Sequence, residues 1–123
     1  MKPIRWMRSS REDLKAFPED AKGELGHSLH LVQCGERPRN EKMLHGDLSG
    51  VSELVADSGD GNTYRCVYTV RLELFVYVLH CFEKKATRGI ATPKRELDAI
   101  RRRLKEAREE YRRYQRSHNA KNR

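Results

Sequence analysis

Three basic side chains in the middle of the chain could together handle a phosphate. Arg65 lies in the alternating stretch 64–70, His80 lies in the apolar stretch 72–81, and Lys84 follows His80 by four residues. Arginine and lysine stabilise the negative charge that builds on phosphorus during phosphodiester cleavage, and histidine transfers protons near neutral pH. If the two stretches are neighbouring strands, the sequence predicts a concave face that carries all three side chains.

Each of these residues also has a purely structural interpretation. Arg65 could pair with a carboxylate on a neighbouring strand, and Glu53 and Glu73 are the candidates. The lysine pair at 84–85 could simply keep the end of a hydrophobic strand soluble. His80 could be an ordinary buried strand residue.

The elements that would position these side chains follow from local patterns. Alternation and apolar runs predict strands at 51–56, 64–70 and 72–81, and the short connection at 71–73 indicates an antiparallel hairpin between the last two. The run 72–81 is apolar at nearly every position, which is typical of a central strand covered on both faces.

The remaining chain predicts an opening strand and three helices. Residues 4–7 resemble a short strand. Ser9 and Glu12 have the spacing of a capping box, which predicts a short helix that ends near Phe17. Apolar residues at three- and four-residue steps predict a second helix over 19–33, and the glycine-containing stretch 34–50 is predicted to be a loop.

A long C-terminal helix is predicted over 93–117, with Thr92 as its N-cap, and a frayed tail over 118–123. We assign the apolar positions from Leu97 to Leu104 to the core. The later positions of the same seam are expected to reach beyond the core: Ala107, Tyr111 and Tyr114.

Together these elements predict a single α+β domain over residues 1–117. Its order is β-α-α-β-β-β-α, with a small twisted antiparallel sheet, an N-terminal αα-hairpin on one face and the long C-terminal helix. A chain of 123 residues has room for one modest core.

The charge is concentrated in the C-terminal helix. The net charge is +8, and residues 94–123 contain 12 basic and 5 acidic residues, a balance of 12 − 5 = +7. Such asymmetry favours a nucleic-acid contact or an acidic protein partner.

Several classes are excluded or disfavoured by composition. The apolar run 70–82 is far shorter than a membrane span, and residues 1–6 contain no stretch of signal-peptide length. The three cysteines form an odd set without a C-x-x-C pair, so reduced, buried thiols in a cytosolic protein are expected. No nucleotide or zinc motif is present, and we expect neither a metal nor a cofactor.

Three segments resemble a known family. They are KMLHGDLSGVSEL (42–54), TYRCVYTV (63–70) and LHCFEKKATRGIATPKRELDAIRRRL (79–104), and they resemble the phage-derived, HigB-like toxins of the RelE/ParE superfamily. The resemblance implies a RelE-like fold and a cytoplasmic toxin of a type II toxin–antitoxin system. It also implies a helix-turn-helix antitoxin as partner and metal-independent cleavage of mRNA on the translating ribosome.

The resemblance also implies roles for individual residues. Arg65 occupies the position of the strand arginine that faces the scissile phosphate in RelE-like toxins, and Lys84 and Lys85 match the lysine pair that closes the last strand. The expected catalytic residues are therefore Arg65, Lys84 and His80, and the expected substrate-binding residues are Lys42, Lys85 and Arg88.

Two other functions remain open at this point. ParE toxins share the sheet but poison DNA gyrase without cutting RNA, so the fold alone does not decide the activity. A non-catalytic nucleic-acid-binding phage protein would also account for the basic C-terminal helix.

Overall fold

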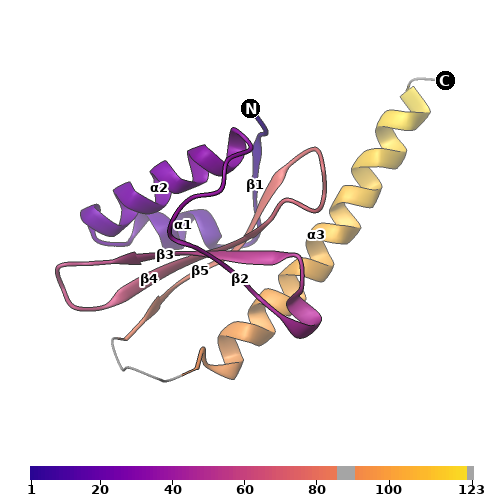
Figure 1. The fold of residues 1–123 in the computed structure, drawn as a ribbon. Coiled ribbons are helices and arrows are strands. Elements are labelled where there is room, and N and C mark those ends of the chain that lie inside the picture. The colour runs from indigo at the N-terminus through magenta and orange to yellow at the C-terminus, as the bar shows by residue number, and fades with distance from the viewer. Residues whose placement is uncertain (86–90, 122–123) are drawn as a thin grey trace.

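The computed structural model describes residues 1–85 and 91–121, and Figure 1 shows their arrangement. A five-stranded sheet lies between two helical layers. The elements follow in this order: β1 (Ile4–Trp6), α1 (Ser10–Lys15), α2 (Glu19–Gln33), β2 (Glu41–Met43), a 3-10 turn η1 (Gly46–Leu48), β3 (Val51–Asp57), β4 (Thr63–Thr69), β5 (Val76–Lys84) and α3 (Lys94–Lys121).

The sheet is mixed, whereas a wholly antiparallel sheet was predicted. Its strand order is β1-β5-β4-β3-β2, and β2 to β5 pair antiparallel as expected. β1, however, runs parallel to β5, with Ile4 opposite Val76. The α+β class and the central position of β5 are confirmed, because β5 has a neighbour on each side.

The αα-hairpin covers one face of the sheet, as predicted. α2 begins and ends where the periodicity placed it, and it buries Leu25, Leu29 and Val32 against residues of β3 and β4 such as Leu54 and Tyr68. Burying this apolar stripe stabilises α2 despite two glycines in its interior.

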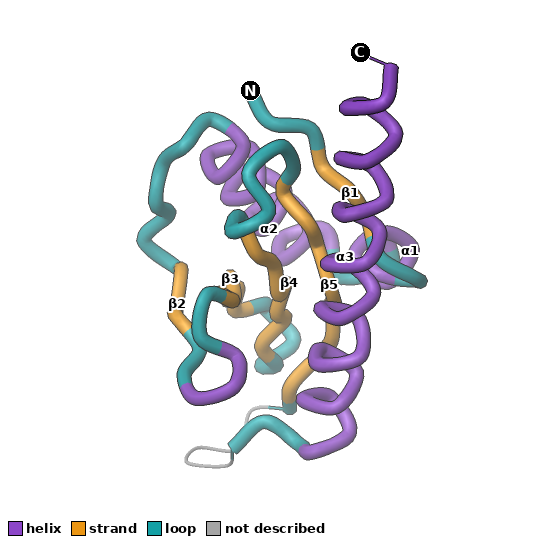
Figure 2. The backbone as a smooth tube through the Cα atoms, turned by 90° about the vertical axis from the view of Figure 1, so that its right-hand side faces the viewer, coloured by secondary structure: helices purple, strands orange, loops and turns teal. Residues whose placement is uncertain are grey.

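α3 covers the opposite face, and Figure 2 shows it running alongside β5. The prediction that Ala107 and Tyr111 reach beyond the core was wrong, because both are buried in it. Tyr114 packs edge-on against Phe75, with ring centroids 4.9 Å apart. The helix runs back along the whole of β5 to Phe75, which extends the core by three further seam positions.

Other local predictions differ in detail. The predicted loop 34–50 contains the edge strand β2, and β5 begins at Val76, four residues later than predicted. The Ser9 hydroxyl donates to the Asp13 carboxylate at 2.8 Å and makes no capping bond. The helix α3 begins at Lys94 rather than Pro93, and its backbone continues to Lys121.

The thiols fall into two groups. Cys66 and Cys81 are free and buried, as expected, whereas Cys34 is exposed at the end of α2, contrary to expectation. Within the described residues, no helix combines the length and the apolar character needed to cross a bilayer.

Candidate phosphate-binding site

Strand register places three predicted site residues on the sheet face that α3 covers. Lys42 lies opposite Glu53 across β2 and β3, and Lys84 lies opposite Thr63 across β4 and β5. Arg65 is two residues after Thr63 and therefore shares its face. We call Lys42, Arg65 and Lys84, together with the Glu53 carboxylate between them, the basic row.

Arg65 is held in the basic row by a buried ion pair with Glu53. The pair joins Nη1 of Arg65 to Oε1 of Glu53, and the two side chains are only 11% and 7% exposed. The structural interpretation of Arg65 is thereby confirmed for Glu53 and not for Glu73. Nε of Arg65 is also buried and has no hydrogen-bond partner among the described residues. The guanidinium is thus oriented by Glu53 while part of its donor capacity is unused.

Lys84 is sensitive to the charges of the row. Partial burial, followed by the nearby positive charge of Arg65, lowers the pKa of the Lys84 ammonium, and Lys42 adds to the effect while Glu53 opposes it. Three cations and one carboxylate leave a surplus of 3 − 1 = 2 positive charges. An anion bound at this row would relieve the mutual repulsion of its cations.

Both members of the lysine pair open onto one hollow. Lys84 and Lys85 line a cavity of about 340 Å³ together with Arg95 at the start of α3. Lys84 therefore belongs both to this hollow and to the basic row, and the two lysines do not lie on separate sides of the molecule. The predicted substrate-binding residue Arg88 lies outside the described residues.

His80 shares the face of the basic row but is engaged elsewhere. Its Nε2 lies 3.4 Å from Glu96, and its Nδ1 lies 2.7 Å from Nη1 of Arg103. Since an arginine can only donate, Nδ1 must accept, which makes the ring neutral with its proton on Nε2. Burial, followed by the charge of Arg103, lowers the pKa of His80.

Phe82 separates His80 from the cations. It is the register partner of Arg65, lies between His80 and Lys84 on β5, and stacks on the His80 ring with centroids 5.1 Å apart. The contacts of His80 therefore suit a residue that ties β5 to α3 better than a free proton carrier.

A β-bulge in β5 lies directly before His80. Val67 pairs with His80 whereas the next residue of β4 pairs with Val78, so Leu79 is an extra residue in β5. A bulge re-aims neighbouring side chains. Here Leu79 packs in the α3-side core, and its carbonyl accepts a 3.1 Å hydrogen bond from Arg103.

Sequence reasoning missed the two helix residues that hold His80. Glu96 and Arg103 are seven residues apart and therefore lie on one face of α3. An acidic and a basic residue at this spacing could together contact a polar residue of the sheet. The spacing does not indicate which residue of the sheet that would be.

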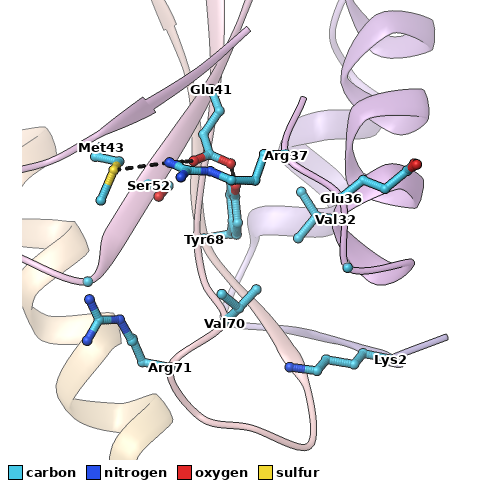
Figure 3. Close-up of a pocket in the computed structure, with 12 residues that line it drawn as sticks. Lys2, Val32, Glu36, Arg37, Glu41, Met43, Ser52, Tyr68, Val70 and Arg71 are labelled. Carbon is cyan, nitrogen blue, oxygen red and sulfur yellow. Dashed lines mark hydrogen bonds and ion pairs between the residues drawn. The ribbon is translucent and has the colours of Figure 1, made fainter. Parts of the chain in front are cut away.

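A second hollow lies at the other face of the sheet (Figure 3). Its volume is about 350 Å³, and three of the polar residues that line it contact one another. Tyr68 donates to Glu41 at 2.6 Å, and Arg37 donates to the same carboxylate at 3.2 Å. Burial, reinforced by the hydrogen bond to Glu41, raises the pKa of Tyr68. Of the predicted site residues that the structure describes, none lines this hollow.

The described part of the chain contains no cluster of side chains that could hold a metal ion. No group of three or more histidine, cysteine or acidic side chains comes together there. What the basic row can do is bind an anion and stabilise negative charge.

Comparison with known proteins gives one family match. The model for the family described as phage-derived protein Gp49-like (DUF891) matches residues 12–105. No curated protein matches the chain. Among solved structures, the chain is similar to a chain in the crystal structure of the toxin–antitoxin complex RelBE2 from Mycobacterium tuberculosis, with 19% sequence identity and a TM-score of 0.49. The match covers 68% of this chain and 98% of the chain in the crystal structure. The family match includes the whole basic row.

Proposed function

Because the chain belongs to the phage-derived, Gp49-like family, a family of RelE/HigB-type toxins, we propose that it is the toxin of a toxin–antitoxin system and that it cleaves mRNA on the ribosome. The observation that carries the proposal is the basic row, in which cations from three strands surround one carboxylate on a single face of the sheet.

In this proposal the basic row binds the scissile phosphate. The neighbouring ribose 2′-hydroxyl loses its proton to solvent water and forms a bond to phosphorus while the bond to the 5′-oxygen breaks. This places extra negative charge on the phosphoryl oxygens, and Arg65 and Lys84 stabilise that charge. Lys84 is also suited to protonate the departing 5′-oxygen, because its lowered pKa makes the ammonium a stronger acid. Lys42 and Lys85 bind the adjoining RNA backbone.

The partners follow from the same proposal. A toxin that acts on translating ribosomes works in the cytoplasm, and its antitoxin neutralises it by covering the basic row. We expect that antitoxin to be a helix-turn-helix protein encoded beside the toxin.

The test is to express the protein alone and map the 5′ ends of cellular mRNA. New ends at ribosome-occupied codons are expected. Lys84→Ala should reduce their frequency about 100-fold, which is the usual effect of removing one group that stabilises a transition-state oxyanion. Lys15→Ala, which removes the same charge from an exposed position on α1, should leave them unchanged.

Intact mRNA together with double-strand DNA breaks would overturn the nuclease proposal in favour of a gyrase inhibitor. Intact mRNA and intact DNA, with RNA binding retained, would leave a nucleic-acid-binding protein without catalytic activity.

A further inference from the structure

Two flanks of α3 differ in the charged side chains that they carry. Two of the five acidic residues in 94–123 lie on the flank that faces the N-terminal strand and loop. Glu110 pairs with Arg5 at 3.3 Å, and Glu106 pairs with Arg8. These two carboxylates are therefore paired with arginines outside the helix, and Glu106 also feels the charges of Arg103 and Arg102 on α3.

The other flank of α3 carries a row of exposed cations. Lys105, Arg108, Arg112 and Arg116 follow one another at steps of three, four and four residues, so they lie along one line of the helix. Among the described residues, none of the four has a carboxylate within ion-pair distance. At 1.5 Å per residue, the 116 − 105 = 11 steps span about 16 Å. We call these four residues the α3 stripe.

The surface around the stripe lacks the features of a protein interface. Protein interfaces are anchored by buried aromatic and apolar side chains. The apolar positions of α3 face the sheet, and the large hydrophobic residues that are exposed in the described chain are not on α3: Met1, Met43, Val70 and Leu74. Interfaces with nucleic acids, in contrast, are polar and strongly positive.

We propose that the α3 stripe docks on the phosphate backbone of double-helical RNA, as a surface separate from the basic row. This inference rests on the proposed function, because ribosomal RNA is the helical RNA that a ribosome-dependent toxin meets. Figure 1 shows the C-terminal end of α3 extending past the sheet, and the four side chains of the stripe are exposed. The stripe would hold the toxin on the ribosome while the basic row engages the message.

The experiment compares two full-length variants of equal charge. The stripe variant carries Lys105→Gln, Arg108→Gln and Arg112→Gln, and the control variant carries Arg11→Gln, Lys15→Gln and Arg39→Gln at other exposed positions. Both lower the net charge from +8 to +5. Glutamine keeps a good helix propensity, so thermal melts of both variants should match that of the unchanged protein.

Binding of a labelled 20-base-pair RNA duplex is measured by fluorescence anisotropy over a series of salt concentrations. Each lost phosphate contact lowers the slope of log K against log salt by about 1. The stripe variant should therefore lose about 3 from the slope and bind more weakly, whereas the control should keep the slope. Glu109→Gln, which removes the acid nearest the stripe in sequence, should tighten binding.

Equal slopes for the two variants would overturn the proposal and assign the stripe to a protein partner or to solvent. Tighter binding of a DNA duplex, with the same loss of slope, would overturn the choice of RNA. Duplex binding does not require cleavage, so a failure of the nuclease proposal would be recognised separately, by unchanged mRNA 5′ ends.

Discussion

Arg65 and Glu53 depend on each other because both are buried between β5 and β2. A buried charge without its partner costs far more than the pair itself contributes, since neither group can return to water. The pair therefore restricts which substitutions the sheet tolerates, whatever Arg65 does for a substrate.

Replacing Arg65 alone should destabilise the fold strongly. Arg65→Met leaves the Glu53 carboxylate buried and unpaired, and we expect the free energy of unfolding to fall by about 3–5 kcal/mol. Urea denaturation of the single variant and of the double variant Arg65→Met/Glu53→Leu measures the coupling. The double variant should regain most of the loss, and a single-variant loss below about 1 kcal/mol would contradict the buried pair.

His80 should make stability depend on pH between 7.5 and 5.5. Its pKa is lowered in the folded protein, mainly by burial and by Arg103, so the unfolded chain binds the proton more readily below the ordinary value of 6.5. Stability should therefore fall as the pH falls, by at most about 1.4 kcal/mol per pH unit. In His80→Gln this part of the dependence should disappear. Parallel urea titrations at both pH values test this, and identical pH dependence in the two proteins would count against the neutral ring.

At the scale of elements, α2 carries two glycines that its packing does not require. A Cβ atom added at Gly23 or Gly26 would meet no atom within 4 Å. Both lie on the exposed side, while Leu25 and Leu29 bury the opposite side. Burial of its apolar side stabilises α2, whereas the two glycines lower its helix propensity. Residues with a higher helix propensity at these positions should therefore stabilise the protein.

Substituting these glycines should stabilise the protein. Gly23→Ala and Gly26→Ala should each raise the free energy of unfolding by up to about 1 kcal/mol, because alanine restricts the unfolded chain and favours the helix. Gly35→Ala is the matched control, since Gly35 follows the helix with φ of +85° and its substitution should cost about 1–2 kcal/mol. Chemical denaturation gives the free energy of unfolding of all three variants. A loss of stability on substitution of Gly23 or Gly26 would contradict the open space around these two positions.

Elements with a long periodic pattern could be predicted from the sequence, and short or pairing-dependent ones could not. The bounds of α2 and the presence of β3, β4 and β5 follow from burial at regular steps. β2 is three residues of mixed polarity at the edge of the sheet, so it carries no pattern of its own. The end of the core on α3 depends on where Phe75 lies, which is a property of the fold.

At the scale of the whole molecule, the candidate site was predictable only where alternation sufficed. Alternation places Arg65 with Glu53, and it places Lys84 on the face that they share. Alternation also places His80 on this face, but it does not show that Glu96 and Arg103 of a distant helix bind the ring. Contacts between remote segments depend on how the layers stack.

The parallel pairing of β1 with β5 has a consequence for synthesis. Ile4 pairs with Val76, a separation of 76 − 4 = 72 residues along the chain. The first strand to emerge from the exit tunnel must therefore wait, unpaired, until the last strand is made, and α3 can cover the core only later still. Contacts over such distances form slowly. The pairing of β1 and the cover that α3 provides are therefore the late steps of folding, whereas the antiparallel pairs of β2, β3 and β4 can form earlier.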